Sequence, residues 1–454
     1  MAYAEKVYKV RNGKATKQFT WRSRYKKPDG TWGTQPGFDT KRLAEDYGNQ
    51  QEALIKMYQW VDPERAEMHF GKWAREWMAS RAPRGRTITT RWDRLDTHIL
   101  PRWEHTPLIK VNWFDAEAWA NSVSLTHDDS TASQCLTLMS QIMTGAVDAG
   151  CILVNPLAGR RRSRPAAVKQ RIQQKATARA EGEARAADPE RLLRVARRLG
   201  PLDGTHLLTT AFAGPRWGEG LALTKEDSLG ERKEPHWGGF FTCPTLQLRQ
   251  EVAEYQTRDP ATGKKGPMFF GLEPLKTDGS LRDVDLPPFL HELILAQIER
   301  LPEKVSWLYC TRSGKCWRGS NFGRQVMRPA CDGREALPKS KGHRAREKWD
   351  PIIPGMTMDL LRHTHDTYQA QIGVAEPLAF EQAGHRRPGI KAVYQHPTPD
   401  MRKQRLEGLQ EIFERAMSNL GWDQIWEKSE LISGIPPKRS LGAGKRAPRA
   451  RSVA

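Results

Sequence analysis

The sequence has no apolar run long enough to span a membrane. Over 454 residues, no uncharged stretch approaches the roughly 20 residues that a membrane helix needs. The N-terminal segment MAYAEKVYKVRNGK carries charged residues from its fifth position, and no apolar stretch follows, which argues against a signal peptide. We therefore expect no membrane anchor and a cytoplasmic location.

Cysteine is scarce and scattered. The 6 cysteines form no CxxC pair and no cluster with histidine, which argues against a disulfide framework and against structural zinc. The chain also lacks a GxxxxGK[ST] loop, so no ATP site is expected. Asp283 and Asp285 alternate at strand spacing, and we expect them to be solvated side chains rather than a metal pair. The sequence thus predicts no metal and no cofactor.

Positive charge is abundant and unevenly placed. The net charge is +20, and the whole excess lies in residues 1–61, 160–179 and 434–454, of which the last two contain no acidic residue. One basic tail or linker would be explained by solubility alone. Three such regions on one chain favour binding to a polyanion, and nucleic acid is the best candidate because neutralised phosphates release counterions.

The N-terminal region is predicted to be a small sheet followed by a helix. Short strand patterns run from residue 6 to about residue 38, and Thr40 is a good N-cap for the helix behind them. A small basic sheet can enter a DNA major groove, so residues 1–61 are predicted to bind DNA. The candidate contacts are Arg22, Arg24 and Lys26.

A helical domain is predicted over residues 68–158. Phe70, Trp73 and Trp77 recur at helical spacing, and a second amphipathic stripe precedes the stop at Asn155. We expect this aromatic stripe to be core rather than a base-stacking platform.

A basic linker is predicted over residues 159–187, since bulky apolar residues are almost absent there. Asp188 then offers an N-cap for a new domain over residues 188–420, followed by a C-terminal segment and basic tail over 421–454. Three adjacent side chains of the linker are predicted to contact DNA, namely Arg160, Arg161 and Arg162.

The residues that could carry chemistry lie in four pieces of this last domain. AFAGPRWGEGLAL presents Arg216 after a Gly-Pro turn, and EPLKTDGSLRDVDLP is a polar loop that carries Lys276. TMDLLRHTHDTYQAQIGV is an amphipathic helix with Arg362 at the edge of its apolar face. QAGHRRPGIKAVYQHPTPDMR places His385 nine positions before Tyr394.

In their order and spacing, these pieces closely resemble the tyrosine recombinases, specifically integrases of phages and integrative elements. The resemblance covers nearly the whole chain and implies an arm-type DNA-binding domain, a helical core-binding domain and an α+β catalytic domain. The fold class is therefore multidomain and mainly α with small β-sheets. By this resemblance Arg216, Lys276, Arg362, His385 and Tyr394 are catalytic, and Glu219 orients its neighbours.

The residue types suit attack on a phosphodiester. Two guanidiniums can neutralise the non-bridging oxygens with permanently charged, forked donors. Tyr394 would be the nucleophile, Lys276 could protonate the departing 5′-oxygen, and His385 could hydrogen-bond the phosphate. The covalent 3′-phosphotyrosine would conserve the bond energy for resealing. Arg282 lies near Lys276 in the chain, and His363 and His365 flank Arg362, where helix packing explains them as well as catalysis does.

One position departs from the family pattern. Family members commonly place His or Lys three residues before the second arginine, where this chain has Asp359. A carboxylate cannot donate a hydrogen bond to phosphate at neutral pH. With Thr357 as N-cap, Asp359 would instead lie in a first helical turn, where its charge complements the helix dipole.

The sequence is therefore expected to encode a site-specific DNA integrase of a phage or mobile element, acting as a homotetramer on paired double-stranded attachment sites in a bacterial cytoplasm. A host bending factor and a directionality factor are possible partners. The alternatives are a type IB topoisomerase-like relaxing enzyme and a non-catalytic DNA-binding regulator.

Overall fold

The structure is a computed structural model that describes residues 2–11, 14–81, 85–182, 186–339, 345–387, 389 and 394–426. It divides into two compact units, Met1–Gln174 with Gln256–Pro267, and Lys175–Tyr255 with Met268–Ala454. Of the basic tail predicted over 421–454, residues 427–454 lie outside the described part. Among the residues that the structure describes, no helix has both the length and the apolar character that a membrane span needs.

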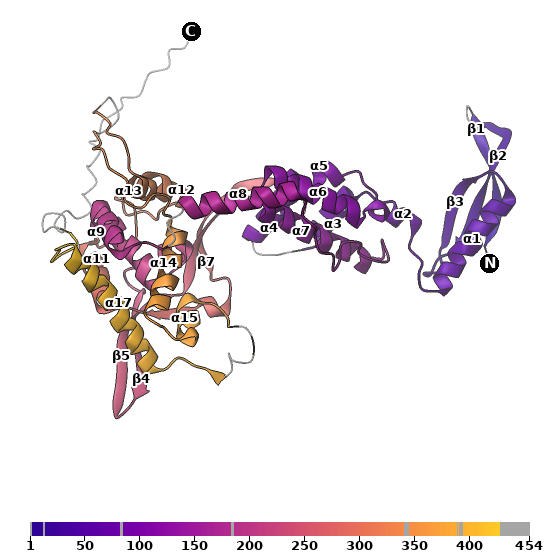
Figure 1. Ribbon diagram of the computed structural model, residues 1–454. Helices are drawn as coiled ribbons and strands as arrows, with labels where there is room; N and C mark the ends of the chain where they lie inside the picture. Colours follow the sequence, from indigo (N-terminus) through magenta and orange to yellow (C-terminus); the bar gives the residue numbers. More distant parts are fainter. Residues whose placement is uncertain are drawn as a thin grey trace, which may run out of the picture. The chain divides into compact units, whose positions relative to one another are not determined.

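The N-terminal region is a three-stranded antiparallel sheet covered by one helix, as expected. The strands β1 (Tyr3–Arg11), β2 (Lys14–Lys26) and β3 (Trp32–Phe38) are ordered β1-β2-β3, and α1 (Lys41–Lys56) lies along the sheet (Figure 1). The Thr40 side chain caps α1 by accepting a hydrogen bond from the Leu43 N–H at 3.3 Å.

The rest of the first unit is mainly helical, and the aromatic stripe is core, as predicted. Phe70 is fully buried and Trp77 is nearly so, packed with Trp92, Trp103 and Met139. Apolar residues at every third or fourth position form one continuous face of a helix, and here that face packs against neighbouring helices. The helices are α2 (Pro63–Ala66), α3 (Phe70–Ala79), α4 (Gly85–Arg94), the π-helical η1 (Leu95–Ile99), α5 (Leu100–Trp103), the 3-10 helix η2 (Leu108–Lys110), α6 (Trp113–Thr126) and α7 (Asp129–Asp148).

Much of the predicted linker is helical. Helix α8 (Ala166–Gly182) occupies most of residues 159–187. Its sequence AAVKQRIQQKATARAEG is rich in alanine, glutamine, lysine and arginine, which favour helix even where few apolar residues are present. The low apolar content of this stretch did not predict the helix.

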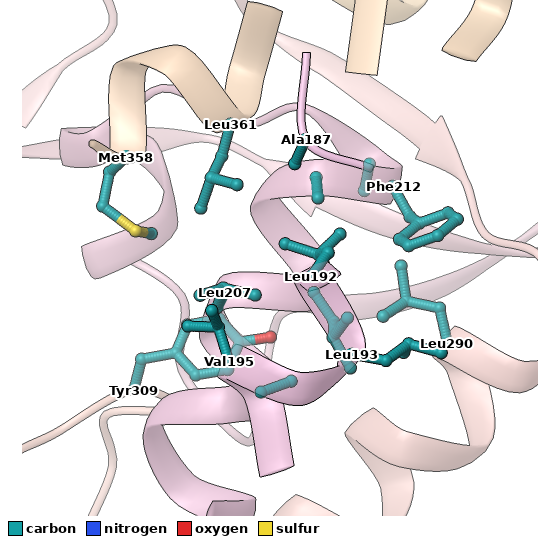
Figure 2. Packing of buried hydrophobic residues seen from close by; sticks show 14 of the residues in the cluster. Ala187, Leu192, Leu193, Val195, Leu207, Phe212, Leu290, Tyr309, Met358 and Leu361 are labelled. Atoms are coloured by element: carbon teal, nitrogen blue, oxygen red, sulfur yellow. The ribbon is translucent and has the colours of Figure 1, made fainter. Parts of the chain in front are cut away.

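The second unit is built around α9 (Pro189–Ala213), whose N-cap is Asp188, as predicted. Figure 2 shows side chains of α9, including Leu192 and Phe212, packed with Leu290 and Leu361 from other helices. Its kink coincides with Gly200, which has a φ of +77°, and with Pro201. The other helices are α10 (Trp217–Leu221), α11 (Pro288–Arg300), α12 (Gly319–Phe322), the π-helical η4 (Gly323–Met327), α13 (Arg328–Asp332), α14 (Met358–Gln371), α15 (Glu376–Ala383) and α17 (Pro399–Asn419).

A three-stranded antiparallel sheet completes the second unit. Its order is β4 (Leu229–His236), β5 (Gly239–Leu248) and β8 (Arg282–Asp285), and the pair Leu246 with Val284 fixes the register of β5 against β8. A separate two-stranded sheet pairs β6 (Gln250–Arg258) with β7 (Lys265–Pro274), and the short 3-10 helix η3 (Asp278–Ser280) precedes β8. The expected architecture, mainly helical with small sheets, is confirmed.

Asp285 is not solvated, contrary to expectation. It is fully buried, with one carboxylate oxygen 2.6 Å from Arg232 Nε and the other 2.8 Å from Arg402 Nη1. Gln382 Nε2 also donates to it at 3.2 Å. Asp283, two residues earlier on the same face of the strand, pairs with Arg249 near the surface. Strand alternation places both aspartates on one face, so it could not show that only Asp285 is fully buried.

We predict that Asp285→Ala lowers the free energy of unfolding of the second unit by about 3 kcal/mol, because Arg232 and Arg402 would lose their fully buried anion and keep only the partly exposed carboxylates of Glu234 and Glu381. Asp283→Ala, the matched control on the same strand, breaks a more exposed pair and should cost about 1 kcal/mol or less. Differential scanning calorimetry of the full chain measures both. Equal losses would show that the burial of Asp285 has no energetic consequence.

Candidate functional site

A tight turn presents Arg216 at the start of α10. Helix α9 ends at Gly214, whose φ of +68° is a left-handed conformation that favours glycine. A Cβ at this position would lie 2.4 Å from Cδ2 of His365, so the turn also depends on the missing side chain. The Arg216 N–H then donates to Glu219 Oε2 at 2.9 Å, which fixes the first turn of α10.

The Glu219 carboxylate is the centre of the site. It is 1% exposed and lies 2.8 Å from Arg216 Nη1 and 2.9 Å from Arg282 Nη2. Arg362 Nη1 is 3.9 Å from the same carboxylate. One buried anion therefore holds three guanidiniums that come from α10, β8 and α14. The predicted orienting role of Glu219 has this geometry as its physical basis.

The charges of the cluster shift the pKa values within it. Burial alone would raise the pKa of Glu219, but the hydrogen bonds and charges of Arg282 and Arg216 outweigh it and leave the pKa below its ordinary value. Burial, followed by repulsion from Arg216 and Arg282, lowers the pKa of Arg362 to about 10. Both side chains are therefore charged at neutral pH.

Hydrogen bonds to two backbone carbonyls orient the Arg362 side chain. Its Nη1 donates to the Gly214 oxygen and its Nη2 to the Ala383 oxygen, each at 2.5 Å, so it joins the turn before α10 to the end of α15. Helix α14 begins as the sequence predicts, with the Thr357 hydroxyl accepting from the Leu360 N–H at 3.2 Å. Asp359 lies exposed in the first turn, one helical turn before Arg362.

His385 lies beside Arg362 and is neutral at pH 7. Its Nε2 is 3.4 Å from Arg362 Nη2, and because a guanidinium only donates, this nitrogen must accept. Burial, with repulsion from Arg362 and Arg216, lowers the pKa of His385. The remaining ring proton is therefore on Nδ1. Gly384, just before it, has a φ of +65°, and a Cβ there would lie 2.8 Å from Arg282 Nη1.

Two of the predicted catalytic side chains are not in this cluster. Lys276 is exposed between β7 and η3, and Tyr394 is 75% exposed just before α17 begins. Neither makes a hydrogen bond or ion pair within the part of the chain that the structure describes. The structure thus brings Arg216, Glu219 and Arg362 together with His385, and it leaves Lys276 and Tyr394 facing solvent.

The sequence prediction missed Arg282 as a member of the cluster. It is 6% exposed, and its guanidinium also donates to the Gln382 and Ser280 carbonyls. Its anionic partner, Glu219, lies 63 residues earlier, so no local spacing indicates the pair. His365 is fully buried, within 3.5 Å of Arg405, which supports its packing interpretation.

The basic residues predicted to bind DNA fall into two groups. Arg22, Arg24 and Lys26 alternate along β2 with the buried Ser23 and Tyr25, so they share the face of the sheet that α1 does not cover. Glu5 lies among them, 3.1 Å from Arg24 Nε.

In the predicted linker, Arg160 and Arg161 are exposed, but Arg162 is committed inside the protein. Its side chain is 6% exposed and lies 2.7 Å from Asp129 Oδ1. It also donates to Asn121 and to Ser124. The guanidinium cannot contact DNA without breaking this network, which argues against the predicted DNA contact at Arg162.

No group of three or more His, Cys, Asp or Glu side chains in the described ranges could hold a metal ion. The described cysteines carry no disulfide, and five of the six are buried. Burial raises the pKa of Cys310, and that of Cys331, to about 12, so these thiols are protonated at neutral pH.

No protein-family model and no curated protein matches the chain. Among solved structures, it is similar to a fragment of the Tn1549 transposon integrase bound to transposon right end DNA, with 14% identity, a TM-score of 0.49, and coverage of 72% of this chain and 98% of that one. It is also similar to a lambda integrase dimer bound to a core site, with 15% identity, a TM-score of 0.44, and coverage of 85% and 93%. A lambda integrase tetramer bound to a Holliday junction is similar as well, with 15% identity, a TM-score of 0.43, and coverage of 82% of this chain and 92% of that one. Such likenesses assign no function by themselves.

We predict that Glu219 makes stability depend on pH in the acid range. Because its folded pKa is depressed, its contribution is fully present above the unfolded pKa of about 4.3 and is lost as the pH falls through the lower folded value. Glu219→Gln should therefore cost about 3–5 kcal/mol at pH 7, and this difference from the wild type should shrink below about pH 4.

Urea unfolding at a series of pH values measures the difference. Glu226→Gln removes an exposed carboxylate seven residues along and should change the unfolding free energy by less than about 0.5 kcal/mol at every pH. A Glu219→Gln difference that stays constant down to pH 3 would contradict the assignment.

Proposed function

We propose that the chain is a tyrosine recombinase, an integrase that cleaves and rejoins DNA strands at attachment sites through a 3′-phosphotyrosine intermediate. The observation that carries the proposal is the Glu219-centred cluster, which gathers Arg216 and Arg362 with His385 on one surface. All are residues that the four sequence pieces predicted, although they come from positions 216 to 385 of the chain. A protein that only bound DNA would have no need to gather these side chains around one buried carboxylate.

The cluster suits a phosphodiester anion. Three guanidiniums surround one carboxylate, so the site retains an excess of positive charge. Arg216 is 39% exposed and uses Nη1 on Glu219, which leaves its outer donors directed to a ligand. The neutral His385 can add a hydrogen bond from Nδ1. These groups would stabilise the charge that develops on the non-bridging oxygens during attack.

The reaction itself is a transesterification. The Tyr394 oxygen attacks the phosphorus and loses its proton to water, while the bond from phosphorus to the 5′-oxygen breaks and that oxygen takes a proton from Lys276. The product is a 3′-phosphotyrosine and a free 5′-hydroxyl, and the reverse attack by a 5′-hydroxyl of the partner strand reseals the DNA. Tyr394 and Lys276 are both exposed, and the proposal requires each of them to reach the bound phosphate.

We further propose a role for each of the other regions of the chain. Residues 1–61 would bind distal arm DNA through Arg22, Arg24 and Lys26, and residues 68–158 would bind the core site with help from Arg160 and Arg161. Residues 188–420 would form the catalytic domain. The enzyme would act in a bacterial cytoplasm as a homotetramer on paired sites of a phage or other mobile element, with a bending factor and a directionality factor as candidate partners.

The proposal predicts that Tyr394→Phe binds DNA normally and forms no covalent adduct, because a phenyl ring has no nucleophilic oxygen. A nicked suicide substrate traps the adduct, which a denaturing gel then resolves. Its sequence is that of the attachment site beside the gene in an integrated element. Tyr58→Phe, which alters a tyrosine that is 96% exposed elsewhere in the chain, should form adduct at the wild-type rate.

Undiminished adduct from Tyr394→Phe would remove this residue from the mechanism. If the wild type binds the site but never forms an adduct, the chain is a DNA-binding regulator. If it relaxes supercoiled DNA without recombining paired sites, it is a topoisomerase-like enzyme.

A further prediction concerns Asp359, which lies exposed in the first turn of α14. If it only complements the helix dipole, Asp359→Ala should cost about 1 kcal/mol of stability or less and less than about tenfold in the rate of adduct formation. Arg362→Ala, on the same helix, should lose roughly 10²-fold or more because it removes a charge that the transition state needs. Comparable losses at both positions, with unchanged melting of Asp359→Ala, would make the carboxylate catalytic.

A further inference from the structure

A single arginine bridges the segment that carries the candidate nucleophile. Arg387 follows His385 by two residues, and its side chain is 9% exposed although it lies in a loop. It donates from Nη2 to the Gln395 side chain at 2.8 Å and from Nη1 to the Gln395 carbonyl at 3.3 Å. Gln395 is the residue directly after Tyr394. The bridge therefore closes the loop immediately beside the tyrosine.

The other end of the bridge is a helix that already belongs to the site. Arg387 Nη2 lies 3.0 Å from Glu376, the first residue of α15. The last residue of α15 is Ala383, whose carbonyl receives Arg362. One guanidinium thus ties the tyrosine segment to the same helix that aims a catalytic arginine.

The chain is also anchored just after the tyrosine. Helix α17 begins at Pro399, where the Thr398 hydroxyl accepts from the Met401 N–H. Within its first two turns, Arg402 lies 2.8 Å from Asp285, and Arg405 donates to the Asp285 carbonyl at 2.8 Å. In the chain, Tyr394 therefore lies between Arg387 and the buried arginines of α17. A change in either set of contacts would alter the position of its oxygen.

We propose that Arg387 is a positioning residue for Tyr394, acting through Gln395 and Glu376. This inference rests on the proposed function. A planar fork can hold both partners at once, whereas the single ammonium of a lysine cannot reproduce that geometry. Because attack on phosphorus demands close and aligned atoms, a misplacement of about 1 Å is enough to cost roughly 10²-fold in rate.

The experiment measures single-turnover adduct formation on a suicide substrate by the full chain. Arg387→Gln should form adduct about 10- to 100-fold more slowly than the wild type, while its affinity for the DNA changes by no more than about twofold. Arg387→Lys should fall between the two. The matched control is Arg415→Gln, which breaks an exposed ion pair with Glu411 on α17 and should leave the rate unchanged.

Two further measurements separate positioning from general loss of structure. Gln395→Ala should slow adduct formation in the same direction, and the double variant with Arg387→Gln should lose little more than either single variant, because both remove one interaction. A substrate with sulfur in place of the bridging 5′-oxygen has a leaving group that needs no proton. It should rescue Lys276→Ala but not Arg387→Gln, whose defect lies in the approach of the nucleophile.

Wild-type rates for Arg387→Gln, strictly additive losses with Gln395→Ala, or full rescue by the sulfur substrate would each overturn the positioning role. So would a loss of rate that only follows a loss of folded protein, measured by thermal melting of the same samples. Failure of the proposed function looks different, because the wild type itself would then form no adduct.

Discussion

The second unit depends on one electrostatic constraint, which is that three guanidiniums must be held together before any ligand arrives. Arg216, Arg282 and Arg362 repel one another, and the buried Glu219 carboxylate is the group that makes their proximity tolerable. Backbone carbonyls supply the rest of the compensation, since the oxygens of Gly214 and Ala383 both receive Arg362. Left-handed glycines end the two helices here, where a Cβ at Gly214 would meet His365 and a Cβ at Gly384 would meet Arg282.

The same solution appears a second time behind the site. Asp285 is a fully buried anion shared by Arg232 and Arg402, which come from separate elements, just as Glu219 is shared by its arginines. Arg405 then donates to the carbonyl of the same aspartate, which fixes α17 against β8. Buried pairs of this kind add little net stability over an apolar core, but they permit few alternative arrangements. That property suits a site in which charged groups from distant segments must meet in one geometry.

The sequence predicted what depends on neighbours in the chain. Thr40, Asp188 and Thr357 each cap a helix as expected, because a cap and its partner are three residues apart. The order of the four motif pieces likewise predicted that Arg216 and Arg362 would share a site with His385. The buried roles of Asp285 and Arg162 could not be predicted, because their partners are distant in the chain. The two arginines that bind Asp285 lie 53 and 117 residues from it, and the aspartate that binds Arg162 lies 33 residues from it. A charge on a polar strand or in a basic run looks the same whether it is solvated or paired.

Within the described residues Tyr394 makes no hydrogen bond or ion pair with the cluster, and this bears on the order of events in the proposed reaction. The cluster has two more positive charges than negative ones, counting its three arginines and Glu219, so an anion is the ligand that it lacks. A bound phosphodiester supplies one negative charge and leaves one cation in excess, and that remaining charge favours the phenolate as it forms. A tyrosine that reached the arginines first would compete with the phosphate for the same donors. In the proposed reaction, holding Tyr394 in an exposed segment, joined to the site through α15 and α17, would keep those donors available until DNA occupied them.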